Sequence, residues 1–178
     1  MRHTRLAAVL LAIAWAAAGP AAADSLATPE AMDPSCRGHE QNRITYLKEL
    51  ELVVNGGRME LVDELVAADY VNHSAPPGAP QGREAIRSYL KLLKGAFPDR
   101  KVKNEMLLCA GDYVIVRSTV TGTSTGPYFD RPPTGKTFSV MGTDIYLVRD
   151  GQLRARWGNE DALGMMGQLG YLPAEGAR

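Results

Sequence analysis

The chain has 178 residues and carries 20 Lys and Arg side chains against 20 Asp and Glu, so its formal net charge is zero. A neutral chain without a basic stripe is not expected to bind nucleic acid. Its two cysteines and three histidines do not cluster, so we expect no zinc site, and no sequence feature calls for a cofactor.

The first 23 residues are typical of a secretory signal. A short basic start precedes an apolar run over 6–18, and three alanines at 21–23 precede Asp24. This is the layout of a signal with an A-x-A cleavage site. The apolar run is shorter than the ~20 residues that cross a bilayer. We therefore expect an exported protein, periplasmic or secreted, with no membrane contact after cleavage; an uncleaved membrane anchor is the alternative.

The two cysteines, Cys36 and Cys109, lie far apart in the sequence. In an exported protein a disulfide between them is plausible, and it would tie the first helix to a strand. The alternative is a pair of buried thiols that behave as small apolar residues. The sequence does not give the separation of the two Cα atoms that decides between these states.

The first half of the domain predicts helices, because its apolar residues recur at helical spacing. After a loose leader over 24–35, the pattern predicts helices over 36–54, 59–67 and 81–97, with a brief strand over 70–73 between the last two. Carboxylates on these helices, such as Glu49 with Glu51 and Glu60 with Glu64, are interpreted as parts of solvated faces.

The second half predicts strands, because the apolar period changes to two. We expect strands over 101–108, 113–123, 136–149 and 153–158, and a final helix over 161–169. Gly111-Asp112 and Asp150-Gly151 predict the two hairpin turns. Helices followed by a run of antiparallel strands indicate an α+β fold. The predicted segments are a signal, a leader with the start of the first helix, one domain and a tail: 1–23, 24–41, 42–170 and 171–178.

Asp144 is the first candidate for chemistry. It shares the parity of Phe138, Val140 and Tyr146 in its strand, so a carboxylate falls on an apolar face. Burial raises the pKa of such a group toward the range useful for acid–base catalysis. The alternative is structural pairing. A bulge at the Asp150-Gly151 turn would place Arg156 opposite Asp144, and a shift of one residue would place Trp157 there.

Polar residues elsewhere are weaker candidates. His73 follows Asn72 where a strand meets a loop, and it could lie on the surface or form a hydrogen bond; its unperturbed pKa suits proton transfer near neutral pH. Arg117 could contact an anion or a carbonyl inside the cavity, or form a salt bridge on an exposed face. Asp161 is expected to cap the last helix, since Asp is a favoured N-cap residue. Glu160 could take a catalytic role or lie in solvent.

Aromatic residues could form the wall of a pocket or belong to the plain core. Tyr146 and Trp157 are the two that neighbour Asp144 and Arg156 in the predicted hairpin. The stretch Pro132-Pro133-Thr134-Gly135 is interpreted as a turn that sets the register of the next strand.

Several segments together resemble the SnoaL-like polyketide cyclase, or ester cyclase, family. They include LVDELVAADYVNHSAPPG, QGREAIRSYLKLLKGAFPD, AGDYVIVRSTVTGT, PPTG and QLG, and the resemblance spans roughly 42–170. It implies a cone-shaped fold like that of nuclear transport factor 2. In that fold a curled, mostly antiparallel sheet packs on N-terminal helices around a central cavity, and a short C-terminal helix follows.

The resemblance also implies where chemistry would lie. It implies that His73 points toward the mouth of the cavity. In the family, a histidine and an aspartate on the last hairpin are the catalytic pair, and the aspartate is the proposed acid–base group of an aldol ring closure. An ungapped comparison places the histidine near Asp144 and the aspartate at Gly158. Neither residue type is retained, and the family's Gly-Thr-His-x-Gly has Ser124 in place of its histidine.

Three functions follow from these observations. The first is a cofactor-independent acid–base enzyme acting on a small hydrophobic or aromatic carbonyl compound. In it, Asp144 with Arg156 and His73 would move a proton, and Arg117 or Ser124 would stabilise an enolate. The second is a module that binds such a molecule in the same cavity without turnover. The third is assembly as a homodimer through the exposed face of the sheet. The fold alone does not choose among them.

Overall fold

The structure, a computed structural model, describes residues 33–172. The predicted signal over 1–23 lies outside these residues, as do most of the predicted leader and the end of the predicted tail. The described part contains a five-stranded sheet and several helices that precede or follow it in the chain. The expected α+β class is therefore confirmed.

The first predicted helix is shorter than expected and has an unusual end. Cys36 belongs to a separate 3₁₀ turn, η3 (Pro34–Cys36), and the α-helix α2 runs over Glu40–Lys48. The chain then continues as a π-helical turn, η4 (Glu49–Val54). A π turn inserts one extra residue into a helix, so it rotates the side chains that follow relative to a regular helical pattern.

The remaining helices follow the predicted positions with small changes. The predicted helix over 59–67 is a 3₁₀ turn, η5 (Met59–Leu61), and one α-helical turn, α3 (Val62–Leu65), because the chain is already extended from Val66 onward. The long helix α4 covers Gly82–Ala96, and α5 covers Ala162–Gln168. Asp161 caps α5 as predicted, accepting a hydrogen bond from the amide of Gly164. Among the described helices, none is long and apolar enough to cross a membrane.

The sheet has the order β1-β5-β4-β3-β2. The strands are β1 (Val66–Asn72), β2 (Lys101–Ala110), β3 (Tyr113–Thr123), β4 (Thr137–Arg149) and β5 (Gln152–Glu160). The four strands β2 to β5 pair antiparallel in chain order, and β1 adds to β5 in parallel. The sheet is thus mostly antiparallel, as expected, and its last hairpin, β4–β5, has a strand on each side.

The turn of the last hairpin is tight, and the irregularity lies beyond it. Asp150 and Gly151 both have positive φ, at 54° and 71°, as a two-residue type I′ turn requires. Arg149 pairs with Gln152, and the register then shifts by one residue between Leu147 and Val148. The predicted bulge therefore exists, but it lies inside the hairpin and not at its turn.

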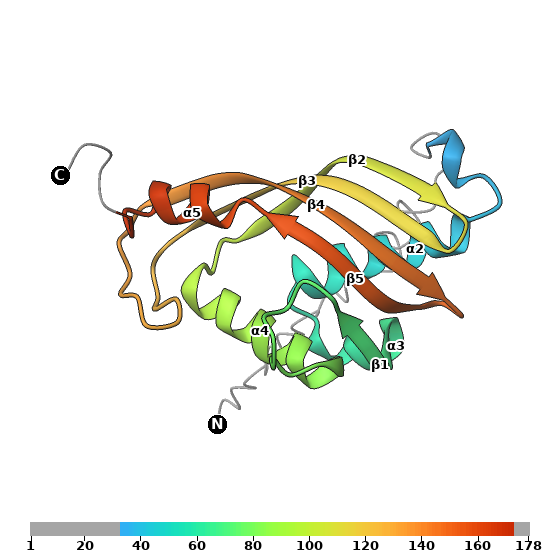
Figure 1. The fold of residues 1–178 in the computed structure, drawn as a ribbon, viewed down its shortest axis with the longest axis horizontal. Helices are drawn as coiled ribbons and strands as arrows, with labels where there is room; N and C mark the ends of the chain where they lie inside the picture. Colours follow the sequence, from blue (N-terminus) through green and yellow to red (C-terminus); the bar gives the residue numbers. More distant parts are fainter. Residues whose placement is uncertain (1–32, 173–178) are drawn as a thin grey trace, which may run out of the picture.

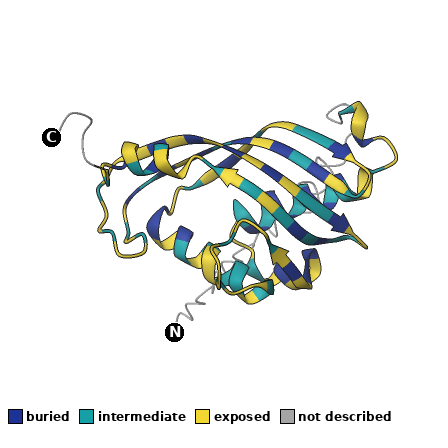
Figure 2. Ribbon diagram, in the orientation of Figure 1, coloured by how far each residue is buried: buried dark blue, intermediate teal, exposed yellow. Residues whose placement is uncertain are grey.

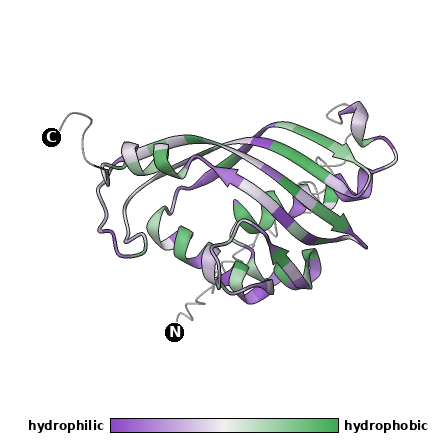
Figure 3. Ribbon diagram, viewed as in Figure 1, coloured by the Kyte–Doolittle hydropathy of each residue, from purple (hydrophilic) through white to green (hydrophobic). Residues whose placement is uncertain are grey.

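One face of the sheet is covered by helices (Figure 1). Helices α2, α3 and α4 lie beneath the sheet, and α5 lies beside the start of β4. Along β3 and β4 buried and exposed residues alternate, as the two faces of a half-covered sheet require (Figure 2). Figure 3 shows hydrophobic and hydrophilic residues mixed along the same strands. We call the helix-covered side the inner face and the other side the outer face.

The two cysteines are joined in a disulfide. The bond between Cys36 and Cys109 connects η3 to β2, at a sequence separation of 73. Both residues are buried in the core. The link fixes the start of the described chain to the second strand of the sheet, close to the start of α2.

Candidate functional site

The inner face of β4 and β5 carries charged side chains among apolar ones. Asp144 lies between Val140 and Val148 on the buried face of β4 and is only 6% exposed. The sequence pattern placed it there, and the structure agrees. Its direct neighbour on β5 is Gly158, whereas Arg156 lies opposite Tyr146. Both predicted registers, with Arg156 or Trp157 opposite Asp144, are therefore wrong, because the bulge shifts the pairing the other way.

Arg156 nevertheless reaches Asp144 diagonally across the hairpin. Its Nε atom donates to Oδ1 of Asp144 at 2.8 Å, and Nη2 lies 2.6 Å from the same oxygen. The second oxygen, Oδ2, accepts no hydrogen bond from any described residue. The side chains of Arg156 and Asp144 keep 20% and 9% of their exposure, so the pair is buried without being sealed from solvent.

Gly158 makes this ion pair possible. A Cβ atom at position 158 would lie 1.9 Å from Oδ1 of Asp144 and 2.6 Å from Nη2 of Arg156. No side chain can occupy that space while the two charged groups are bonded. The glycine and the ion pair therefore depend on one another.

Burial and charge act in opposite directions on the pair. Burial raises the pKa of Asp144, and the neighbouring Arg156 limits that rise. Burial disfavours the charge on Arg156, but the nearby Tyr146 and Asp144 outweigh it and raise the pKa of the guanidinium. Arg156 is thus always charged, and the pair is held as an ion pair.

A second carboxylate, Glu49, faces the same region from the helical layer. The sequence interpretation of Glu49 as part of a solvated face is wrong, because the residue is 6% exposed. Its carboxylate makes no hydrogen bond or salt bridge with the described residues. Burial raises its pKa to about 7; the charge of Arg156 lowers it, and that of Asp144 raises it. Glu51 alone of the two fits the solvated interpretation, since it pairs with Lys101.

Three tyrosines surround these groups. Tyr46 of α2 packs on Tyr146 of β4, with ring centroids 4.9 Å apart, and its hydroxyl donates to Asn104. Tyr70 of β1 is buried beside them, and its pKa is raised by burial and by the charge of Glu49. Glu49 also contributes to the raised pKa of Tyr46 and of Tyr146 after burial. The region therefore combines an aromatic wall with two carboxylates and one guanidinium.

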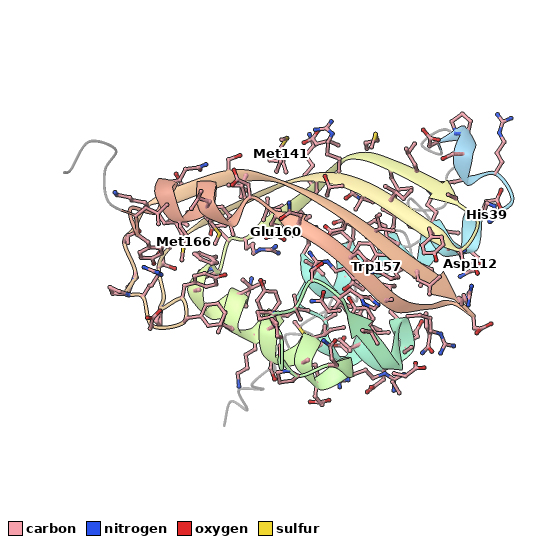
Figure 4. The ribbon with its side chains drawn as sticks, viewed as in Figure 1. His39, Asp112, Met141, Trp157, Glu160 and Met166 are labelled. Atoms are coloured by element: carbon pink, nitrogen blue, oxygen red, sulfur yellow. A yellow bond between two sulfur atoms is a disulfide. The ribbon has the colours of Figure 1, made fainter. Side chains whose placement is uncertain are left out.

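Glu160 forms a second ion pair at the end of β5. It lies opposite Gly142, and its Oε1 accepts a hydrogen bond from Nη2 of Arg100 at 3.2 Å. Figure 4 shows Glu160 near the end of the strand. The charge of Glu160 adds to the causes that raise the pKa of Asp144, after burial. Glu160 is thus a neighbour of the inner cluster and not a solvated residue.

A pocket of about 520 Å³ lies elsewhere. It is formed by the ends of β4 and β5 and the start of α5, lined by Met141, Gly142, Thr143, Asn159, Glu160, Asp161, Ala162 and Leu163. Met141, Thr143 and Asn159 lie on the opposite face of the sheet from Asp144, so this pocket does not contain the ion pair. The two carboxylates that line it already have structural partners, since Glu160 pairs with Arg100 and Asp161 caps α5. We therefore place the candidate site at the charged cluster. The described residues include no group of three or more His, Cys, Asp or Glu side chains placed to hold a metal ion.

Comparison with known proteins identifies the family of this chain. The model of the SnoaL-like polyketide cyclase family matches residues 44–169, which is most of the chain. The chain belongs to the SnoaL-like polyketide cyclase family. Among curated proteins none matches it.

Solved structures support the same assignment. TsrD from Streptomyces laurentii is 27% identical with a TM-score of 0.65, over 79% of this chain and 99% of that one. IdmH from Streptomyces antibioticus is 30% identical with a TM-score of 0.65, over 73% and 99%. A SnoaL-like polyketide cyclase from Agrobacterium tumefaciens, 20% identical with a TM-score of 0.61 over 72% and 97%, shares the fold.

The structure does not bring every predicted residue of this SnoaL-like domain to the cluster. His73 is exposed, and its ring stacks on Trp157 with centroids 4.5 Å apart and planes 3° from parallel. Trp157 lies opposite the exposed Ile145, on the other face of β5 from Arg156 and Gly158, so the stacked rings of Trp157 and His73 lie on the outer face. Of the two alternatives for His73, the surface one is correct, and Trp157 is not a wall of the inner site.

Three other predicted residues lie away from the charged cluster. Arg117 is exposed on the outer face, since it alternates with the buried Val116 and Ser118. The hydroxyl of Ser124 is fully buried; it is 3.1 Å from that of Tyr171 and accepts from the amide of Thr134. Asn72 accepts from the amide of Ser74 and so shapes the turn after β1. None of the three reaches Asp144.

Replacing Gly158 by alanine tests whether the ion pair occupies the space opposite Asp144. The added methyl group would force the two charged side chains apart, and we expect the free energy of unfolding to fall by about 1–3 kcal/mol. Gly95 of α4 is the matched control, because a Cβ atom there meets no other atom within 4 Å. Gly95→Ala should keep or raise stability by up to about 1 kcal/mol. Urea unfolding measures both; equal stability of Gly158→Ala and wild type would contradict the geometry.

Proposed function

We propose that this exported SnoaL-like domain catalyses cofactor-independent proton transfer on a small hydrophobic or aromatic carbonyl compound. The observation that carries the proposal is the buried, partly accessible Asp144–Arg156 pair, whose carboxylate leaves Oδ2 without a bond. Ring closure, isomerisation, dehydration and hydrolysis all need a cation for the oxygen and a carboxylate for the proton, and the cluster around this pair contains both.

The guanidinium of Arg156 supplies the positive charge for the substrate oxygen. The contacts of Arg156 with Asp144 use Nε and Nη2, so Nη1 has donors left for a carbonyl oxygen. A charge that develops on that oxygen would be stabilised more strongly there than in water, because the site is partly desolvated. Asp144 holds the guanidinium in place and is the carboxylate that the sequence singled out. Tyr46, Tyr70 and Tyr146 offer flat surfaces for an aromatic substrate.

Exchange of the hydrogens next to a ketone tests this function without the natural substrate. In D₂O, an enzyme that forms an enolate replaces these hydrogens of a bicyclic aromatic ketone, such as 2-tetralone, with deuterium, which NMR detects. We expect Asp144→Asn to slow the catalysed exchange by roughly 10²-fold or more. Asp112→Asn, at an exposed turn of the same sheet, should leave the rate unchanged.

Loss of one partner also destabilises a buried ion pair, by about 3–5 kcal/mol, so folding must be monitored. The double variant Asp144→Leu with Arg156→Met should recover much of that stability and still lack exchange. A wild-type protein that binds the ketone in a thermal-shift assay but does not exchange its hydrogens would favour the second function, binding without turnover. Full activity of Asp144→Asn would refute the proposed mechanism.

We propose export on the strength of the signal-like first 23 residues and of the disulfide. Disulfides persist in oxidising compartments and are rare in the cytosol. Protein recovered from the periplasm or the medium should begin at Asp24 and contain no titratable thiol, since Cys36 and Cys109 are bonded. N-terminal sequencing and a thiol assay under denaturing conditions check both. An intact Met1 or two free thiols would contradict this assignment.

We also propose that the outer face holds a second copy of the chain. Large apolar side chains are exposed there, and these outer-face residues are Met106, Tyr113, Met141, Ile145 and Trp157. Exposed apolar side chains gathered on one face are typical of association surfaces. Two identical sheet faces related by a twofold axis would cover each other. Sedimentation equilibrium should give a dimer, and Ile145→Lys should give a monomer; a monomeric wild type at high concentration would contradict the proposal.

A further inference from the structure

Glu49 occupies an unusual backbone position. It is the first residue of the π-helical turn, in which the amide of Asn55 donates to the carbonyl oxygen of Leu50. The residues buried around it on the same helical face are Tyr46, Leu50 and Val53. Single π turns inside helices occur frequently at functional sites. Here the turn brings a carboxylate, and not an apolar side chain, against the inner face of the sheet.

The charged and titratable groups around Glu49 come from every neighbouring element. They are Tyr46 from α2, Tyr70 from β1, Asp144 and Tyr146 from β4, and Arg156 from β5. Arg156 is the one cation among them, and Asp144 already holds it in an ion pair. Two carboxylates thus share one guanidinium, and Glu49 is the one without a bond to it. The cluster is electrically balanced only when Glu49 is protonated.

The oxygen atoms of Glu49 keep some exposure although the residue is buried. Every side-chain nitrogen or oxygen atom that is fully buried in the described part of the chain has a hydrogen-bond partner. The oxygen atoms of Glu49 have none, so they cannot be fully buried. A deeply placed carboxylate with accessible, unbonded oxygen atoms can exchange a proton with a ligand.

We propose that Glu49 is the general base of this site. This inference rests on the proposed function and assigns its proton-transfer step. An oxygen of Glu49 takes the proton from the carbon next to the carbonyl. The electron pair of that C–H bond forms the C=C bond, and the carbonyl π pair moves to the oxygen, where Arg156 donates hydrogen bonds to the enolate. The protonated Glu49 then returns a proton to carbon or to an oxygen formed in ring closure.

The two carboxylates then have different roles because their environments differ. Asp144 is a positioning residue, since its ion pair keeps it charged and fixes the guanidinium that binds the oxygen. Glu49 works near its own pKa of about 7, where a base is ionised and its conjugate acid can still return the proton. The rate of exchange should therefore rise as pH increases through about 7.

The test uses Glu49→Gln in the full chain, with 2-tetralone in D₂O as the probe. Gln has the shape of Glu but cannot take the proton, so exchange should fall by roughly 10²-fold or more, and its rise around pH 7 should disappear. Glu51→Gln is the matched control on the same turn, because the side chain of Glu51 bonds to Asn55 and Lys101. That variant should exchange the ketone at the wild-type rate.

A second measurement does not need a substrate. The folded pKa of Glu49 is raised above its ordinary value of 4.5, so folded protein binds more protons than unfolded protein between about 4.5 and 7. Wild-type stability is then lost as pH rises through this window. Glu49→Gln escapes this loss. It should melt at a higher temperature than wild type well above pH 7, and the gap should close as pH falls toward 4.5.

The outcomes separate the two proposals. Exchange by wild type that survives in Glu49→Gln but is lost in Asp144→Asn would overturn the role of Glu49 and leave the function standing. No exchange by wild type with any bicyclic ketone would overturn both. A melting temperature of Glu49→Gln at or below that of wild type throughout the pH range would show that the carboxylate is not an uncompensated buried charge, and would overturn the inference by itself.

Discussion

A guanidinium and a carboxylate that are buried together in a folded domain both lose their hydration, and their mutual attraction offsets that cost. If either group moves away, the other remains as an unpaired buried charge. The Asp144–Arg156 pair imposes this constraint on the last hairpin. It needs a glycine at position 158, because a Cβ atom there would overlap Oδ1 of Asp144. It needs the bulge in β5, which brings Arg156 diagonally onto Asp144. Among the described residues, Arg156 is the cation whose charge lowers the pKa of Glu49, and Asp144 already binds it, so the behaviour of Glu49 depends on this pair.

The same constraint explains how this member departs from the pattern that its family resemblance implied. The positions that the comparison aligned with the family's histidine and aspartate carry Asp144 and Gly158, and these two residues are direct partners in the sheet. The ion pair fills the space that a side chain at 158 would occupy. Charge is thus supplied from Arg156, two residues away on the same strand face, and from Glu49 on the helix below. In the function that we propose, the site keeps its place in the fold while its reactive groups come from other positions.

Much of the fold could be predicted, because the spacing of apolar residues changes clearly from helical to alternating after residue 100. The residues that form the turns are also easily recognised. The burial of Asp144 followed from strand parity alone. The partner of Asp144 did not, because a bulge of one residue inside the hairpin changes every pairing beyond it. Glu49 was missed for a similar reason. The carboxylate of Glu49 was assigned to a solvated face, whereas Tyr46, Leu50 and Val53 are buried and Glu49 lies on that same face. The spacing of Tyr46, Leu50 and Val53 was the signal that could have revealed it.

The central claim is that the inner cluster contains one ion pair and one carboxylate whose charge is not compensated. The most direct measurement is the titration of the Glu49 carboxyl carbon by ¹³C NMR, assigned by the disappearance of its signal in Glu49→Gln. A midpoint near 7, well above the ordinary 4.5 of glutamate, is the expected result. A midpoint at or below 4.5 would mean that Glu49 is solvated or paired, and would contradict the account.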